Sequence, residues 1–99
     1  MSHIMHTYEG VFILEPTLEK DAQEKIAEDI KGMITKGKGT VANVQTWGKR
    51  RLAYLIKKKS EGVYYLFDFS LPPEATKKME AVLKLNEAII RFMIIRKDA

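Results

Sequence analysis

The residues best suited to chemistry in this chain are three consecutive cations, Lys49, Arg50 and Arg51. An arginine guanidinium can donate two parallel hydrogen bonds to a phosphate or a carboxylate, whereas an ordinary solvated surface more often mixes lysine with glutamate. Trp47 and Gly48 come directly before the cations, and β-branched and aromatic residues flank the stretch, as in a strand that bulges at its glycine. The stretch therefore predicts a strand whose cations bind an anionic partner at a rim of a sheet.

Catalytic chemistry has little support in the sequence. The two histidines, His3 and His6, lie in the first six residues, and there is no cysteine, so we expect no Ser-His arrangement, thiol nucleophile or His/Cys metal cluster inside the fold. The acids are spaced as on a solvent-exposed helix face, for example Glu24 and Glu28, and no glycine-rich phosphate-binding motif occurs. We therefore expect no enzyme activity, no cofactor, no metal and no small-molecule substrate.

Length, composition and charge indicate one soluble domain with an anionic partner. The 99 residues, 45 % of them apolar, can build one core but not two, and no apolar run approaches the roughly 20 residues of a membrane helix. The formal charge of +4 is uneven, with acids gathered in 15–29 and cations in 36–38, 49–51, 57–59 and 91–97. A basic face predicts a polyanion, most often nucleic acid. The lack of cysteine and of a signal peptide favours the cytoplasm.

Hydrophobic periodicity predicts a single domain over residues 7–97, preceded by a disordered segment 1–6 and followed by a short polar tail 98–99. The expected elements are a strand over 7–14, a helix from Thr17 or Glu19 to about Lys36, a strand over 40–56, a basic hairpin loop over 57–62, a strand over 63–71, a helix from Pro72 to about Asn86 and a strand over 88–95. Positive φ angles at Gly37 and Gly39 are expected to end the first helix.

This order of strands and helices is the ferredoxin-like split βαβ pattern, an α+β fold. A four-stranded antiparallel sheet with its first and third strands central would carry both helices on one face. In the last strand, Ile90, Phe92 and Ile94 are expected to face this core. The other face of the sheet would stay uncovered by the chain itself.

Alternation places apolar side chains on that uncovered face. Its expected residues are Val11, Ile13, Tyr64, Leu66, Ile89, Met93 and Ile95, with Glu9, Asp68 and Arg91 among them. Asp68 and Arg91 are expected to neutralise each other or other cations. A monomer rarely exposes such a patch unused, so the face predicts a protein partner or stacked bases. Because the strand over 63–71 lacks the aromatic start of the RNA-recognition motif, we favour RNA binding at the cationic rim.

The stretch 47–54, Trp-Gly-Lys-Arg-Arg-Leu-Ala-Tyr, resembles the Gly-x-Arg-x-Leu-Ala-Tyr signature of the bacterial small-subunit ribosomal protein six family. Further agreement is found at Tyr8-Glu9, Pro16, Gly62-x-Tyr64-Tyr65 and Leu85-Asn86-Glu87 before Ile90-Arg91-Phe92-Met93. The resemblance spans essentially residues 7–97. Leu55 departs from it, because the family often has proline there.

The resemblance implies a non-catalytic protein of the small ribosomal subunit that binds the central domain of 16S rRNA as a heterodimer with ribosomal protein eighteen and is a monomer when isolated. It implies structural roles for Gly48 and Leu52. The candidate RNA or partner contacts are Arg50, Arg51, Tyr54 and Arg91 from the resemblance, and Lys49, Lys57, Tyr64 and Leu66 from strand parity and charge. The alternative is a homodimerising or ligand-sensing ferredoxin-like module that uses the open sheet face.

Overall fold

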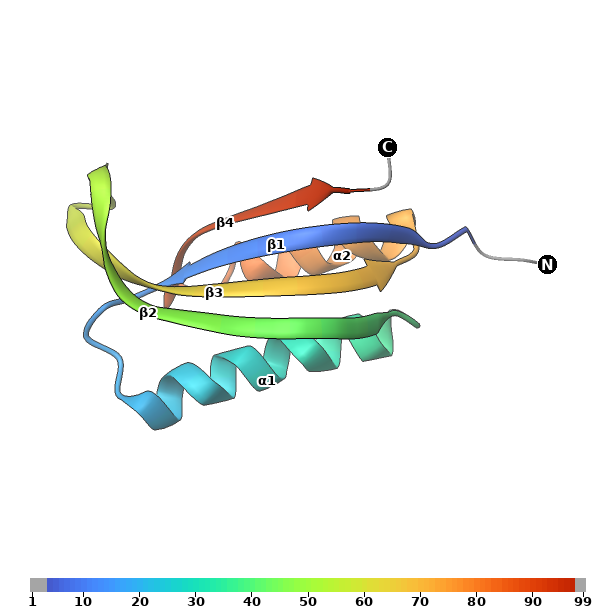
Figure 1. Ribbon diagram of the computed structural model, residues 1–99, viewed down its shortest axis with the longest axis horizontal. Coiled ribbons are helices and arrows are strands. Elements are labelled where there is room, and N and C mark those ends of the chain that lie inside the picture. Colours follow the sequence, from blue (N-terminus) through green and yellow to red (C-terminus); the bar gives the residue numbers. More distant parts are fainter. Residues whose placement is uncertain (1–3, 98–99) are drawn as a thin grey trace.

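The computed structural model describes residues 4–97, which form one antiparallel sheet and two helices (Figure 1). In chain order the elements are β1 (His6–Leu14), α1 (Lys20–Lys36), β2 (Thr40–Ile56), β3 (Lys59–Leu71), α2 (Pro73–Leu83) and β4 (Ile89–Arg96). This is the predicted ferredoxin-like order, with β1 beginning one residue earlier than expected. Residues 1–3 of the expected disordered segment and the expected tail 98–99 lie outside the described residues.

The core lies between the two helices and one face of the sheet. The strand order is β2-β3-β1-β4, so β1 and β3 are central as predicted. Phe12 of β1 and Phe67 of β3 are fully buried and meet edge to face, with ring centroids 5.3 Å apart. Ile34 of α1 and Leu83 of α2 are buried in the same cluster. This packing leaves the second face of the sheet open.

The end of α1 differs from its prediction. The helix begins after Glu19, one of the two predicted starts, but the left-handed residue at its end is Lys38, with φ of 68°, while Gly37 has φ of −79°. Gly39 is needed for space, because a Cβ there would lie 2.2 Å from the carbonyl oxygen of Ser70. Glycine at this position therefore lets the chain pass close to β3 as it enters β2.

One register shift changes which residues of β4 face the core. The pairing of β4 with β1 shifts by one residue just after Ile13. As a result Ile89, predicted on the open face, joins the core cluster, and Ile90, predicted inward, is buried outside that cluster. Phe92 and Ile94 pack against the core as predicted. The bulge thus exchanges the faces of two neighbouring residues.

Candidate nucleic-acid and partner interface

The predicted cations lie on a two-stranded arm formed by the end of β2 and the start of β3, which we define as residues 48–62 and call the hairpin arm. The arm starts at a bulge where the sequence predicts one: Gly48 has φ of 74°, and the register of β2 with β3 shifts between Thr46 and Gly48. A left-handed glycine lets a strand bend sharply. Figure 1 shows the arm curling from the β2 side towards the β4 side of the sheet.

The turn at the tip of the arm is tighter than predicted. Ile56 pairs with Lys59, so the turn consists of Lys57 and Lys58 alone, and the expected six-residue loop over 57–62 is wrong. Both turn residues have positive φ, 49° and 67°, as in a type I′ turn whose twist matches that of the strands. Between the Arg51–Glu61 pair and this turn the register shifts, and residues 52–55 of β2 have no paired residue on β3. At the tip, two exposed lysines are held close together.

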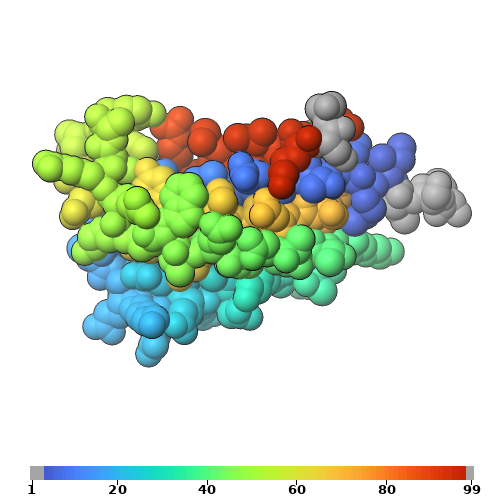
Figure 2. Space-filling model, viewed as in Figure 1, coloured from blue at the N-terminus to red at the C-terminus, as the bar shows by residue number. Residues whose placement is uncertain are grey.

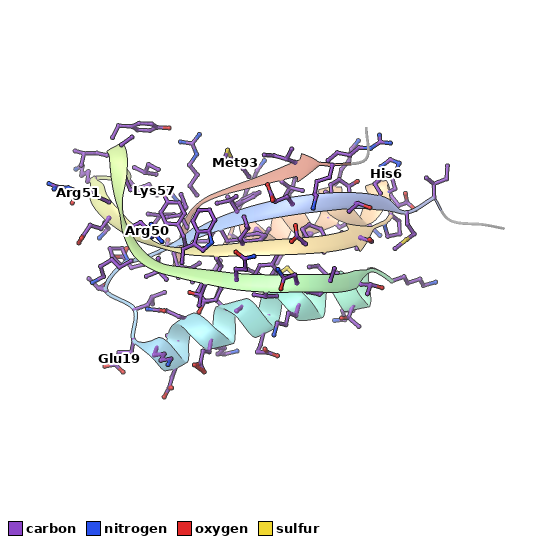
Figure 3. All side chains as sticks on the ribbon, in the orientation of Figure 1. His6, Glu19, Arg50, Arg51, Lys57 and Met93 are labelled. Atoms are coloured by element: carbon purple, nitrogen blue, oxygen red, sulfur yellow. The ribbon has the colours of Figure 1, made fainter. Side chains whose placement is uncertain are left out.

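The arm presents five exposed cations, Lys49, Arg50, Arg51, Lys57 and Lys58. Figure 3 shows the labelled Arg50, Arg51 and Lys57 at the arm end of the molecule, and Figure 2 shows the arm projecting beside β4. Within residues 4–97 none of the five forms an ion pair, whereas four other lysines are paired with carboxylates. Positive charges that are not held in ion pairs are available to neutralise phosphates.

Trp47, Tyr64 and Arg50 form a cluster at the base of the arm, which we call the aromatic cluster. The Trp47 and Tyr64 rings are stacked with centroids 6.2 Å apart and planes 12° apart. The Arg50 guanidinium carbon is 5.8 Å from the centroid of the Trp47 ring, and Arg50 Nε donates to the Trp47 carbonyl oxygen at 3.1 Å. From the sequence, Trp47 is expected only to flank the cations. The signal that marks it is a tryptophan directly before the glycine of a bulge.

A contact between Tyr54 and Arg91 joins the arm to the opposite side of the sheet. The Arg91 guanidinium donates a hydrogen bond to the Tyr54 hydroxyl and lies over its ring, 5.9 Å from the centroid. Because β2 and β4 are the two outer strands, the contact requires the arm to cross the open face. Asp68, expected to neutralise Arg91 or another cation, pairs with Lys97, with 3.1 Å between carboxylate oxygen and Nζ.

A groove of 280 Å³ lies on the open face where the arm crosses it. Its lining is mostly apolar side chains of β1, β4 and the arm. Three predicted residues, Tyr54, Tyr64 and Arg91, line it together with Val11, Ile13 and Met93. The predicted residues thus form two groups, the cations along the arm and the three groove residues. Leu66 belongs to neither group and is half-buried on the same face.

A second, larger cavity of 430 Å³ opens between α1 and α2. Residues such as Met33 and Ala75 line it, and none of the predicted site residues does. Within residues 4–97, no three His, Cys, Asp or Glu side chains come together to hold a metal ion. In the same part of the chain, neither helix has the length and apolar character to cross a membrane. The features that match the sequence-based site therefore all lie on the open face and the arm.

Glu15, which directly follows β1, forms an ion pair with Lys59, the first residue of β3 beside the turn at the tip of the arm. One carboxylate oxygen lies 3.2 Å from Lys59 Nζ and accepts a hydrogen bond from the Thr17 hydroxyl at 3.2 Å. Burial by itself would raise the pKa of Glu15, but the hydrogen bonds from Lys59 and Thr17 and the positive charge of Lys59 outweigh it and lower the pKa. The carboxylate is therefore favoured over the acid in the folded protein.

Acid is expected to weaken this ion pair between Glu15 and Lys59. Because the folded-state pKa of Glu15 is lower than its unfolded value, its stabilisation is fully present above the unfolded pKa and is lost as pH falls through the folded one. The free energy of unfolding of Glu15→Gln should therefore fall less than that of the parent chain between neutral pH and about pH 3. Urea titrations at both pH values measure this. The control is Glu19→Gln, whose carboxylate has no ion pair within residues 4–97; equal pH dependence in the two variants would contradict the prediction.

The chain matches known proteins over nearly its whole length. The family model described as Ribosomal protein S6 matches residues 7–96. A small ribosomal subunit protein bS6 from Clostridium botulinum (strain Hall) is 45 % identical over 94 residues, which cover 95 % of this chain and 100 % of that protein. A protein of the same name from Clostridium perfringens (strain SM101) is 42 % identical over 94 residues, which cover 95 % of this chain and 99 % of that protein.

A solved structure shares the fold. The crystal structure of the 30S ribosomal protein S6 from Thermotoga maritima matches with a TM-score of 0.89 and 29 % identity, over 95 % of this chain and 89 % of that chain. The family match over residues 7–96 contains the signature stretch 47–54, the hairpin arm and every residue that lines the groove. The resemblance drawn from the signature is thereby confirmed, as is the expected location in the small ribosomal subunit. The chain belongs to the ribosomal protein S6 family of the small ribosomal subunit.

Proposed function

We propose that the chain is a non-catalytic protein that binds the central domain of 16S rRNA together with ribosomal protein eighteen. The observation that carries the proposal is the hairpin arm, which presents unpaired cations and borders an apolar groove. A protein that meets RNA and a second protein needs a cationic surface for the first and an apolar surface for the second. Membership of a small-subunit ribosomal protein family supports both kinds of partner and a structural role.

The cations of the arm are assigned to the RNA. Arg50 and Arg51 can each hold a phosphate with two hydrogen bonds, and Lys49, Lys57 and Lys58 add point charges along the same arm. RNA binding by such a surface is salt-dependent, because each neutralised phosphate releases counterions. Each phosphate is expected to add roughly 0.7 to 0.9 to the slope of log affinity against log salt.

The groove and the neighbouring side of β4 are assigned to ribosomal protein eighteen. Met93 and Ile95 of β4 are about half exposed, at 46 % and 50 %, and Tyr54 and Leu55 of the arm are exposed at 61 % and 65 %. Exposed apolar side chains around a concave surface are typical of a protein interface. We expect the isolated chain to be a monomer whose apolar face is covered only in the heterodimer.

The test is binding of the chain to a 16S central-domain RNA fragment over a salt series, with and without ribosomal protein eighteen. Tight, salt-dependent binding that requires the partner is the expected result. Absence of binding in both mixtures would overturn the proposal, and a stable homodimer in sedimentation would favour the dimerising module instead. Met93→Glu places a charge at the groove and should abolish the heterodimer. Ala81→Glu adds the same charge on the exposed side of α2 and should leave it intact.

A further inference from the structure

We propose that the aromatic cluster stacks an unpaired base of the bound RNA. The inference rests on the proposed function, because it names which feature of an RNA this surface takes. Trp47 remains 45 % exposed although it is the largest apolar side chain in the molecule. Its ring is parallel to that of Tyr64 and lies beside unpaired cations. Exposed aromatic rings next to cations are how proteins bind single-stranded RNA.

The bulge explains why Trp47 is placed there. Thr46 pairs with Tyr65 and Gly48 pairs with Tyr64, so Trp47 is the extra residue of β2 and has no partner of its own across the strands. An extra residue in one strand re-aims its side chain, and here it brings the indole beside the ring of Tyr64. With planes 12° apart and centroids 6.2 Å apart, the rings are parallel but displaced sideways. The stacked pair, in which Trp47 is 45 % exposed, forms an aromatic surface beside the cations of the arm.

Arg50 adds charge to this surface. Its guanidinium lies over the Trp47 ring at 5.8 Å and is held by one hydrogen bond to a backbone carbonyl. A guanidinium can stack on a base as it stacks on an aromatic ring, and it can also hold the phosphate of the same nucleotide. The indole nitrogen is occupied by the Gln45 side chain at 3.2 Å, so the ring offers its face and not a hydrogen bond. Recognition through a face accepts any base but requires that the base be unpaired.

Fluorescence of Trp47 gives a direct test, because the chain has no other tryptophan. The chain with ribosomal protein eighteen is titrated with a single-stranded RNA oligonucleotide, with an abasic oligonucleotide of the same number of phosphates, and with the RNA as a duplex. The same mixtures made with Trp47→Leu provide the background to subtract. Stacking predicts quenching by the single strand that the abasic strand and the duplex do not reproduce.

Affinity measured by anisotropy of a labelled single strand separates stacking from charge. Trp47→Leu is expected to lower the affinity about tenfold without changing the salt slope, whereas Trp47→Phe keeps a ring and should lose less. Arg51→Ala should lower the slope instead. Circular dichroism confirms that each variant is folded. Equal binding of the abasic and single strands, with Trp47→Leu matching the parent chain, would overturn base stacking and leave phosphate binding in place. If none of these oligonucleotides binds while the 16S central-domain fragment does, base stacking is overturned and the proposed function stands; if that fragment does not bind either, the proposed function fails as well.

Discussion

Replacing Arg50 and Arg51 together by alanine is expected to lower the affinity for a 16S central-domain RNA fragment by about 100-fold at physiological salt. The estimate assumes that each arginine loses one charge-assisted phosphate contact of roughly 1.5 kcal/mol, and about 1.4 kcal/mol corresponds to a factor of ten. The loss should be large because neither guanidinium is held in an ion pair within residues 4–97, although Glu61 stands across the strands from Arg51. Binding would not have to break an existing ion pair.

The salt dependence identifies the cause of the lost affinity. Removing two phosphate contacts should reduce the slope of log affinity against log salt by about 1.4 to 1.8. The matched control is the double change Lys25→Ala and Lys31→Ala, which removes the same charge from α1, where both lysines are paired with acids. This control should keep nearly the parent affinity. An equal loss in both double variants would show that net charge, and not the arm, governs binding.

Most of the fold could be predicted from the sequence because its signals are local. Alternation marks β1 and β3 within a few residues, and a proline-proline-acid start marks α2. The short connections and right-handed crossovers then fix the sheet order. The bulge at Gly48 was also predictable, because a single glycine interrupted a long run of strand-forming residues.

The groove and the Tyr54–Arg91 contact could not be predicted in the same way. The two residues are 37 positions apart and lie on opposite outer strands. Their meeting depends on the bend that accumulates over three register shifts between β2 and β3. Alternation indicates which side chains of a strand share a face of the sheet, but not how the strand curves. A single register shift exchanges the two faces for the residues beyond it, as Ile89 and Ile90 show. The candidate cations were found because a residue's charge can be read directly from the sequence. The shape of the surface around them depends on strand register and curvature, which the sequence pattern does not give.

Two glycine-to-alanine substitutions, one at the junction between α1 and β2 and one inside α1, are expected to change the free energy of unfolding in opposite directions. Gly39→Ala should lower the free energy of unfolding by about 3 kcal/mol, because the added Cβ would lie 2.2 Å from the Ser70 carbonyl oxygen and 2.7 Å from Leu71 Cδ1. The oxygen belongs to the backbone of a central strand and cannot move aside easily. Gly39 N–H also donates to the Ile34 carbonyl at 2.8 Å, so movement of the junction would strain that bond.

Gly32→Ala makes the same chemical change where no neighbour stands within 4 Å of the new Cβ. Gly32 lies inside α1 and is exposed, so alanine should raise the free energy of unfolding by about 0.5 to 1 kcal/mol through a better helix propensity. Urea denaturation of both variants measures the difference. Because the junction is at the start of β2 and the arm at its end, folded Gly39→Ala should still bind RNA with the parent affinity. Destabilisation by both substitutions would show that glycine is needed at these positions for backbone conformation and not for space. Loss of RNA binding by folded Gly39→Ala would show that the junction controls the shape of the arm.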